Sequence, residues 1–225
     1  MRNYSLPKVG QKVVIFDFCE TLVDFQTADE FLLYIIEKNG MHRLKDLLKF
    51  YSSTLLYKVM GKVSHKFWLK NILLNLVKNI SKKELEYLSL LFYEEKVKSS
   101  LILPVFNVLK KESDDGSYTV IISGGYECYL KHFFPEYVDC VIGTKLEYSL
   151  STNQCCQTSP DCLGVEKLNR LDFISTYIEK DNSSVFSDSY TDMPLFGITN
   201  NSFLVRKNST VNKKLLKGVK YEFNY

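Results

Sequence analysis

Four acidic and hydroxyl side chains that could handle a phosphate group follow short apolar segments of the sequence. Asp17 follows a run of Val, Ile and Phe, Ser123 follows a second run and precedes two glycines, and Asp188 and Asp192 follow a third. A carboxylate can attack phosphorus and form an aspartyl-phosphate, and a hydroxyl beside glycines can approach phosphate oxygens closely. Two further carboxylates suit a hard cation that keeps several waters. The pattern therefore predicts a site for Mg²⁺ and a phosphate group.

Each of these residues also has a plainer interpretation. An Asp at the end of a strand often caps a helix, a Ser before two glycines can form a turn, and two nearby acids can form a solvated turn. The functional interpretation is favoured because the three segments occur together with Lys167, whose ammonium could offset the charge that develops on a phosphoryl group. Lys145 is the alternative source of that positive charge.

The order and spacing of these motifs resemble those of the haloacid dehalogenase (HAD) superfamily of aspartate-nucleophile phosphatases, particularly the phosphoserine-phosphatase-like branch with a helical cap. The motifs are V-V-I-F-D-F-C-E-T-L, T-V-I-I-S-G-G, C-L-G-V-E-K and V-F-S-D-S-Y-T-D, and the resemblance runs from about Val13 to Val205. One such motif alone would be weak support. Together they imply a phosphatase that uses Mg²⁺ and acts on a small phosphorylated metabolite.

The resemblance assigns roles to individual residues. The catalytic residues that it implies are Asp17, Cys19, Ser123 and Lys167. The Mg²⁺ ligands that it implies are the carboxylates of Asp17, Asp188 and Asp192 and the backbone carbonyl of Cys19. The substrate-binding residues that we predict beside them are Thr21, Gln26, Arg43, Gly124 and Gly125.

Cys19 is the main departure from the family pattern. The phosphatases of this family have a second Asp at this position, which protonates the leaving group and then activates water, and a thiol is a poor substitute for a carboxylic acid. General acid–base catalysis is worth about 10²–10⁴-fold in rate. The alternatives are therefore a slow phosphatase, an enzyme for substrates with a good leaving group, or a phosphate-binding regulatory protein. Glu20 could also substitute, although strand alternation points it elsewhere.

A second departure concerns the substrate. The resemblance predicts a glutamate that reads the substrate amine, and Gln26 stands at that position. Arg43 is the one arginine of the predicted cap, so a bidentate clamp for a substrate carboxylate is not assured. A sugar, polyol or amino-alcohol phosphate is therefore favoured over phosphoserine.

The elements that must position these residues alternate between strands and helices. Segment 13–16 is apolar and rich in β-branched residues, as expected for a strand buried on both faces of a parallel sheet. Asp17 stands at its carboxyl end, where ligands bind in open α/β sheets. Further strands are expected at 118–122, 138–144, 184–187 and 203–206, and helices at 105–111, 127–134, 167–179 and 193–198. Segment 149–161 is expected to be a loop, and the tail from Asn208 to contain a lysine-rich helical fragment.

No strand is expected between Thr27 and Lys98, where apolar residues recur at helical spacing. Helices are predicted around 31–36, 44–59 and 67–77, and a fourth begins at the capping box Ser81-Lys-Lys-Glu84. The fold class is therefore α/β, with a Rossmann-like parallel sheet core (HAD-like) and an inserted all-helical cap domain. The predicted core domain comprises residues 1–23 and 101–225, and the predicted cap comprises residues 24–100.

Composition and charge bear on the location of the protein and on the partners that it could bind. The composition, 45% hydrophobic and 24% charged residues, is that of an ordinary globular protein. The sequence has no apolar run typical of a signal peptide or a membrane span, so the protein is expected in the cytoplasm. Its six cysteines are expected to be free thiols rather than ligands of a zinc site. Ten lysines and arginines against one acid lie between Met41 and Lys83. These basic residues are interpreted as solvated helix faces, with action at a membrane surface as a less favoured alternative. Nucleic-acid binding is not expected, and the oligomeric state stays open.

Overall fold

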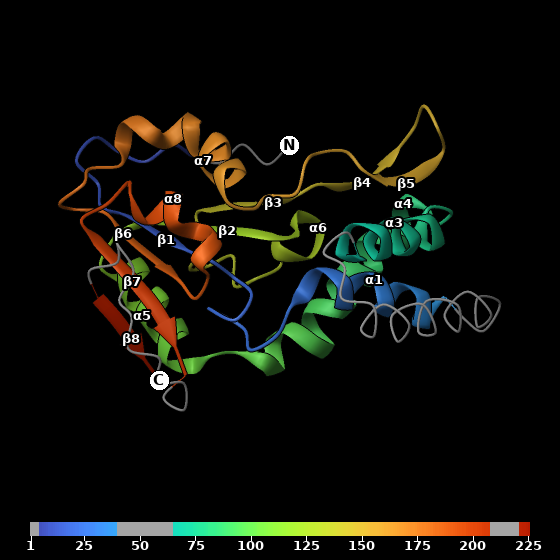
Figure 1. The fold of residues 1–225 in the computed structure, drawn as a ribbon, viewed down its shortest axis with the longest axis horizontal. Coiled ribbons are helices and arrows are strands. Elements are labelled where there is room, and N and C mark those ends of the chain that lie inside the picture. The colour runs from blue at the N-terminus through green and yellow to red at the C-terminus, as the bar shows by residue number, and fades with distance from the viewer. Residues whose placement is uncertain (1–4, 40–64, 208–220) are drawn as a thin grey trace.

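A six-stranded parallel sheet forms the centre of the computed structural model, which describes residues 5–39, 65–207 and 221–225 (Figure 1). The order of the strands across the sheet is β3-β2-β1-β6-β7-β8. Their bounds are Val13–Phe16 for β1, Tyr118–Tyr126 for β2, Cys140–Thr144 for β3, Ser184–Ser187 for β6, Asn201–Arg206 for β7 and Tyr221–Asn224 for β8. This topology places β1 between β2 and β6, so Asp17 emerges between the strands that carry Ser123 and Asp188.

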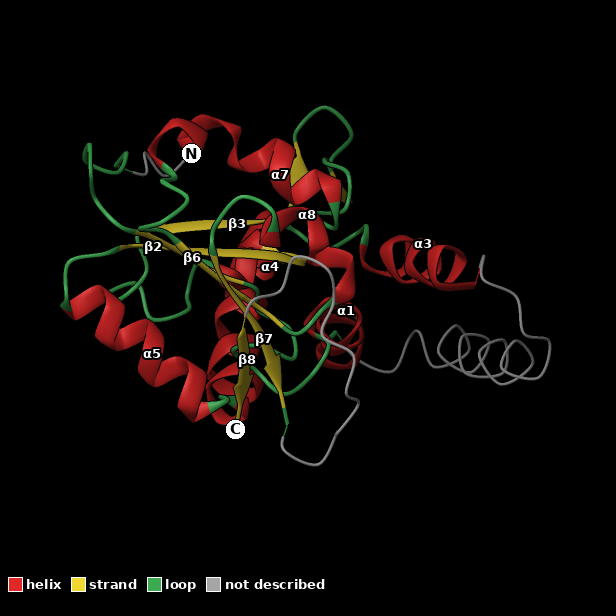
Figure 2. Cartoon of the chain, turned by 60° about the vertical axis from the view of Figure 1, so that its left-hand side comes forward, coloured by secondary structure: helices red, strands yellow, loops and turns green. Residues whose placement is uncertain are grey.

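Helices cover both faces of the sheet (Figure 2). Along β1, Val14 and Phe16 belong to an apolar core shared with α5 (Leu103–Asp114). Val13 and Ile15 belong to a second core on the opposite face, shared with α7 (Val165–Leu171), the 3-10 helix that follows it, and α8 (Met193–Phe196). Alternate residues of a strand point to opposite faces, so the continuous apolar run of β1 is explained by burial on both sides.

The helices that follow β1 lie beyond one end of the sheet (Figure 1). The described ones are α1 (Thr27–Lys38), α3 (His65–Val77) and α4 (Lys82–Phe92). Aromatic rings join α1 and α4 to the short helix α6 (Glu127–Leu130): the ring centroid of Phe92 lies 5.1 Å from that of Phe31 and 5.0 Å from that of Tyr129. These residues share one continuous apolar core with the sheet, so this contact is a packed interface.

The two chain segments that connect these helices to the sheet run side by side. Ile102 N donates to Leu22 O at 2.9 Å, and Asp24 N donates to Ser100 O at 3.0 Å. The helical segment therefore leaves and rejoins the sheet at one place, beside the carboxyl end of β1. The division of the chain into a core and a cap domain stays a prediction.

Most predicted elements are present, but their lengths differ. The capping box of Ser81 and Glu84 is confirmed, with reciprocal hydrogen bonds of 3.2 and 2.7 Å. Strand β2 continues past the predicted end to Tyr126, because Tyr126 pairs with Thr144 of β3. The helix expected at 127–134 is only one turn long, and the one expected at 167–179 changes to a 3-10 helix after Leu171.

The loop predicted at 149–161 was wrong in part. Residues Leu146–Ser149 (β4) and Gln154–Gln157 (β5) form an antiparallel hairpin that packs against α3 and α4. Most residues of the two strands are only half-buried or exposed, which accommodates their polar side chains. The hairpin is held against the helices by contacts that include the 2.8 Å hydrogen bond from Cys155 N to Lys78 O, just after α3. The helix predicted at 44–59 and the lysine-rich tail fragment lie outside the described residues.

Among the described helices, none has the length and apolar character needed to cross a membrane.

Candidate active site

Asp17 lies directly beyond β1 at the carboxyl end of the sheet. Its backbone N–H donates to Phe186 O of β6 at 2.8 Å, and its Oδ1 atom accepts from Phe18 N at 2.7 Å. The residue is 6% exposed. Hydrogen bonds to β6 and to the neighbouring residue therefore fix the backbone and the carboxylate of Asp17.

Lys167 lies between two carboxylates. Its Nζ atom is 2.9 Å from Asp17 Oδ1 and 2.5 Å from Asp192 Oδ2, and the side chains of Lys167 and Asp192 are almost fully buried. Lys167 comes from the first turn of α7 and Asp192 from the segment after β6. Lys145, the alternative cation, is half-buried and forms none of the ion pairs found among the described residues.

Ser187, the last residue of β6, joins the two carboxylates. Its Oγ atom lies 3.3 Å from Asp17 Oδ2 and 2.7 Å from Asp192 Oδ2, and it accepts from Ser189 N at 3.1 Å. Sequence reasoning missed this residue. The feature of the sequence that could have identified Ser187 is its position at the end of a predicted strand, directly before Asp188.

Asp188 is held by Thr21. The Thr21 hydroxyl donates to Asp188 Oδ1 at 3.0 Å, and Asp188 N donates back to Thr21 Oγ1 at 3.0 Å. Thr21 is fully buried, so these contacts make it a positioning residue for Asp188. Direct contact with substrate, which was predicted for Thr21, has no support in these contacts.

The site carries excess negative charge. Asp17 and Asp192 share the buried ammonium of Lys167, and Asp188 adds a third carboxylate near enough to act on Asp17. Burial raises the pKa of Asp17 to about 7, with the charges of Asp192 and Asp188 adding to the effect and Lys167 opposing it. Burial likewise raises the pKa of Asp188 to about 6. Buried carboxylates of this kind are stabilised by further positive charge.

The residues present fit a divalent cation in their chemistry. The Oδ1 atom of Asp192 is buried and has no hydrogen-bond partner, which is unusual for a carboxylate oxygen. Carboxylate and carbonyl oxygens are the ligands that Mg²⁺ prefers. Within the described part of the chain, however, no three Asp, Glu, His or Cys side chains already converge as a metal centre would. Asp17, Asp188 and Asp192 therefore supply suitable donor atoms without converging on one point.

Ser123 and the two glycines after it lie on the neighbouring strand β2. Ser123 is fully buried, and its Oγ atom accepts from Gly125 N at 3.0 Å, which leaves the hydroxyl hydrogen available to another acceptor. A Cβ on Gly124 would lie 2.6 Å from Leu163 Cδ2, and one on Gly125 would collide with the Tyr129 hydroxyl. The buried Tyr129 ring therefore requires a glycine at position 125 independently of any phosphate, whereas the exposed Leu163 side chain could move to admit a Cβ at position 124.

Cys19 lies beside Ser123 and is half-buried. Its Sγ atom is 3.2 Å from Thr27 Oγ1 and 3.9 Å from Ser123 Oγ, and it accepts from Thr27 N at 3.5 Å. Thr27 Oγ1 lies in turn 2.6 Å from the buried Tyr129 hydroxyl. Burial and the nearby charge of Asp17 raise the pKa of the Cys19 thiol, which keeps it protonated at neutral pH. Thr27 and Tyr129 were not predicted, because they approach Cys19 only in the fold.

One of the predicted substrate-binding residues, Gln26, does not join this group. Gln26 is exposed, and its amide donates to Glu20 Oε2 at 3.0 Å. Glu20 is also exposed, with a positive φ of 56°, so it does not replace the missing acid beside Asp17. Arg43 lies outside the described residues.

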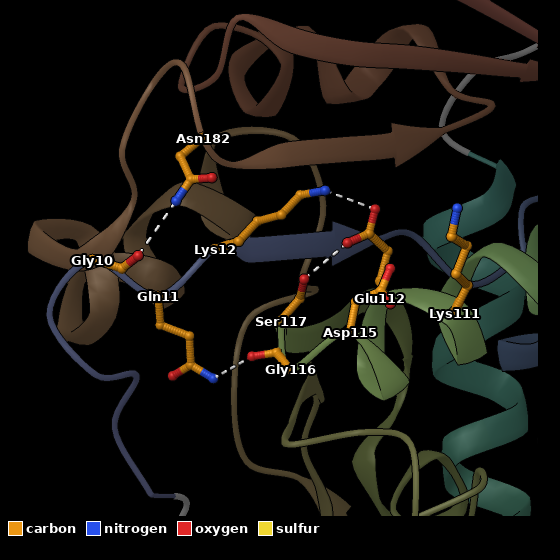
Figure 3. A pocket seen from close by; sticks show the side chains of 9 residues that line it. All are labelled: Gly10, Gln11, Lys12, Lys111, Glu112, Asp115, Gly116, Ser117 and Asn182. Carbon is orange, nitrogen blue, oxygen red and sulfur yellow. Dashed lines mark hydrogen bonds and ion pairs between the residues drawn. The ribbon is translucent and has the colours of Figure 1, made fainter.

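A separate hollow lies at the opposite, amino end of the strands (Figure 3). It has a volume of about 500 Å³ and is lined by polar residues such as Lys12, Glu112 and Asn182. None of the residues discussed above lines it.

Solved structures with this fold include enzymes. A protein of unknown function from Bordetella pertussis Tohama I has a TM-score of 0.70 and 14% identity, with 87% of this chain and 90% of that one covered. A HAD family hydrolase from Salmonella enterica serovar Typhi has a TM-score of 0.61 and 17% identity, with coverages of 98% and 69%. A substrate-bound phosphoserine phosphatase has a TM-score of 0.55 and 16% identity, with coverages of 87% and 86%. At these identities the likeness shows the fold.

No curated protein is detectably similar in sequence. A family model, by contrast, matches the greater part of the chain. The match spans residues 14–197, which include β1, β2, β6 and α7, the elements that carry Asp17, Ser123, Asp188 and Lys167. The chain therefore belongs to the family of haloacid dehalogenase-like hydrolases.

Proposed function

We propose that this hydrolase is a phosphatase that cleaves a small phosphomonoester with Asp17 as the nucleophile. The observation that carries the proposal is the buried group of Asp17, Lys167 and Asp192, in which two carboxylates share one ammonium at 2.9 and 2.5 Å. Burying like charges together is costly for the fold. Such clusters of perturbed carboxylates are characteristic of catalytic sites.

In this mechanism the Asp17 carboxylate attacks phosphorus, and the bond between phosphorus and the ester oxygen breaks. The alcohol oxygen leaves with the bonding electrons and takes a proton from solvent or from the Cys19 thiol. Water then attacks the aspartyl-phosphate, releases inorganic phosphate and regenerates Asp17. The raised pKa of Cys19 makes its thiol a weaker acid than a carboxylic acid would be, so turnover is expected to be slow.

The neighbouring residues orient and stabilise the reacting groups. Lys167 holds Asp17 and offsets negative charge on the phosphoryl group, and the Ser123 hydroxyl donates to a phosphoryl oxygen. Asp17, Asp188, Asp192 and the carbonyl of Cys19 are the groups that would hold Mg²⁺, which when bound would neutralise phosphate charge. Ser187 and Thr21 keep these carboxylates in place through the hydrogen bonds described above.

For the substrate we propose a sugar, polyol or amino-alcohol phosphate. The helices α1, α3 and α4 beside the carboxyl end of β1 would serve as the cap over it. The likeness in fold to a phosphoserine phosphatase supports a small phosphoester, whereas Gln26 paired with Glu20 does not favour phosphoserine itself.

The test is phosphate release from a panel of small phosphoesters in the presence of Mg²⁺. We expect release by the wild-type protein from at least one member of the panel, and none by the Asp17→Asn variant. Equal release by both proteins would contradict the proposed role of Asp17. Magnesium dependence is checked by repeating the assay after chelation.

A second candidate function follows from Cys19 alone. A chain that has lost the general acid could retain phosphate affinity and act as a binding or regulatory protein. In that case the wild-type protein binds phosphoesters with Mg²⁺ but releases no phosphate from any of them.

A further inference from the structure

Four polar side chains form a line of short contacts beside Asp17. Tyr129 Oη lies 2.6 Å from Thr27 Oγ1, Thr27 Oγ1 lies 3.2 Å from Cys19 Sγ, and Cys19 Sγ lies 3.9 Å from Ser123 Oγ. Tyr129, Thr27 and Ser123 are at most 1% exposed, so bulk water does not compete for these contacts. The mechanism above gives a role to Cys19 and Ser123 but none to Thr27 and Tyr129.

The surroundings of the Tyr129 hydroxyl decide the direction of these hydrogen bonds. Among the described residues, Thr27 Oγ1 is the acceptor within hydrogen-bond distance of this hydroxyl. A buried hydroxyl normally donates its hydrogen, so Tyr129 donates to Thr27. The Thr27 hydroxyl then donates onward to Cys19 Sγ. The opposite direction would leave the hydrogen of Tyr129 buried without an acceptor, which is costly.

Cys19 Sγ thereby accepts two hydrogen bonds from one residue. The Thr27 hydroxyl donates at 3.2 Å and the Thr27 backbone N–H donates at 3.5 Å. The remaining contact of the sulfur among the described residues is Ser123 Oγ, which is left as the acceptor for the S–H hydrogen. Ser123 is the residue to which the mechanism assigns a phosphoryl oxygen. The thiol hydrogen therefore points toward the phosphate site and away from Thr27.

Gly125 and two aromatic rings keep Tyr129 in this arrangement. A Cβ at position 125 would collide with the Tyr129 hydroxyl and would lie 3.0 Å from Thr27 Oγ1. The ring centroid of Tyr129 lies 4.9 Å from that of Phe31 in α1 and 5.0 Å from that of Phe92 in α4. The helices that follow β1 therefore hold the hydroxyl that begins the line of contacts.

We propose that Thr27 and Tyr129 are positioning residues that hold the Cys19 thiol with its hydrogen directed at the leaving group of the substrate. The inference rests on the proposed phosphatase function, for which it selects the thiol, and not solvent, as the proton donor. When the ester bond to phosphorus breaks, the S–H proton passes to the alcohol oxygen and a thiolate remains. The water that attacks the aspartyl-phosphate then gives a proton to this thiolate, so the thiol is restored as inorganic phosphate is released.

This role matters for leaving groups that need a proton. An alkoxide leaves poorly without one, whereas p-nitrophenolate leaves readily because its ring delocalises the negative charge. Loss of the orientation of the thiol should therefore slow the cleavage of alkyl phosphoesters and spare p-nitrophenyl phosphate.

The first test measures kcat and KM for p-nitrophenyl phosphate and for the alkyl phosphoester that the wild-type protein cleaves fastest. We expect Thr27→Val to lower kcat for the alkyl ester about tenfold, the worth of about one hydrogen bond, and Tyr129→Phe to lower it about threefold. KM for the alkyl ester, and kcat for p-nitrophenyl phosphate, should stay within about twofold of the wild type. Thr27→Ser, which keeps the hydroxyl, should recover the rate lost in Thr27→Val.

Tyr126→Phe is the matched control for Tyr129→Phe. It removes the same phenol hydroxyl from a buried tyrosine of the same aromatic cluster, but Tyr126 Oη has no hydrogen-bond partner among the described residues. It should change the rate with neither substrate. Equal slowing of both substrates by Thr27→Val, or equal effects of Tyr129→Phe and Tyr126→Phe, would overturn the proposal and leave the phosphatase function intact.

A second measurement tests the orientation of the thiol without turnover. Raman spectra report the S–H stretching band, and subtracting the spectrum of a Cys19→Ser variant isolates the band of Cys19 from those of the other free cysteines. We expect inorganic phosphate with Mg²⁺ to lower the frequency of this band, because the S–H group then donates to a phosphate oxygen. Tyr129→Phe should weaken the shift, and Tyr126→Phe should not.

A Cys19 band that phosphate does not move would overturn the proposal. A band that moves in a protein that releases no phosphate from any ester would support the positioning role of Thr27 and Tyr129 and contradict the phosphatase function.

Discussion

Both ends of the sheet carry lysine, carboxylate and serine side chains, but the two ends differ in how far these groups are paired. At the amino end (Figure 3), Lys12 pairs with Glu112 at 2.7 Å, Ser117 Oγ donates to Glu112 Oε2 at 2.8 Å, and Gln11 donates to Gly116 O at 2.9 Å. The charges of Lys12 and Glu112 are paired with each other there, and much of the hollow is exposed. At the carboxyl end, two carboxylates share one ammonium, and a buried oxygen of Asp192 has no hydrogen-bond partner.

This difference indicates that buried acidic groups without a full set of partners identify the candidate active site better than the volume of a hollow does. The amino-end hollow has a volume of about 500 Å³, but the side chains of Lys12, Glu112 and Ser117 in it already pair with one another. The carboxyl end is nearly closed, yet the fold holds negative charges there that only a cation or a reacting group would balance. Ligands of open α/β sheets bind at this end. Paired substitutions at the two ends test this comparison.

The largest contrast is expected for the nucleophile. Asp17→Asn should lower phosphate release at least about 10³-fold, because the amide cannot form the aspartyl-phosphate. The matched change at the amino end, Glu112→Gln, should leave release within about twofold of the wild type, since the Glu112 carboxylate pairs with Lys12 and Ser117 at the end of the sheet opposite Asp17. A phosphate-release assay with both variants measures this. A comparable loss in Glu112→Gln would break the distinction between the two ends.

The next contrast concerns the buried lysine. Lys167→Met leaves Asp17 and Asp192 without their shared cation, so we expect the free energy of unfolding at neutral pH to fall by about 3–5 kcal/mol. Lys12→Met removes a partly exposed ion pair and should cost at most about 1 kcal/mol. Urea denaturation of both variants gives the two values. Similar losses would mean that the Lys167 pair is an ordinary structural ion pair.

A smaller change is expected at Cys19. Cys19→Asp restores an acid beside Asp17 and should raise turnover at least about tenfold. Cys19→Ser, which offers a hydroxyl of similar size and no acid, is the control and should not gain. A folded, Mg²⁺-binding Cys19→Asp protein with unchanged turnover would show that the missing acid is not what limits the rate.

The smallest effect is a pH dependence of stability in the metal-free protein. In the folded chain, burial raises the pKa of Asp17 to about 7 and that of Asp188 to about 6, so folding favours their protonated forms. Their contribution to stability is present below the unfolded pKa of 3.8 and is lost as the pH rises through these folded values.

The measurement is thermal unfolding in the presence of a chelator across this pH range. Asp17→Asn removes one of the two titrating groups, so its midpoint should rise relative to that of the wild type as the pH increases. Glu112→Gln should not show this trend. A difference between Asp17→Asn and wild type that stays constant with pH would contradict the burial argument.

Several features of the fold could be predicted because their causes are local. The apolar run of β1 and the capping box at Ser81 depend on neighbouring residues, and both are confirmed. The hairpin of β4 and β5 could not be predicted, since its polar strands are stabilised by α3 and α4 from elsewhere in the chain. The same holds for the extension of β2, which depends on the pairing of Tyr126 with Thr144.

By itself the sequence determined which chemical groups are available: the carboxylates of Asp17, Asp188 and Asp192, the Ser123 hydroxyl, the Lys167 ammonium, and a thiol at Cys19. Only the tertiary structure decided how they are used. It placed Lys167 between Asp17 and Asp192. It also brought the Thr21 hydroxyl within hydrogen-bond distance of Asp188, and the Gln26 amide within hydrogen-bond distance of Glu20. The reason is that the sequence gives the chemical type of each residue directly. The hydrogen-bond partners and the burial of that residue depend instead on strands from distant parts of the chain that come together in the sheet.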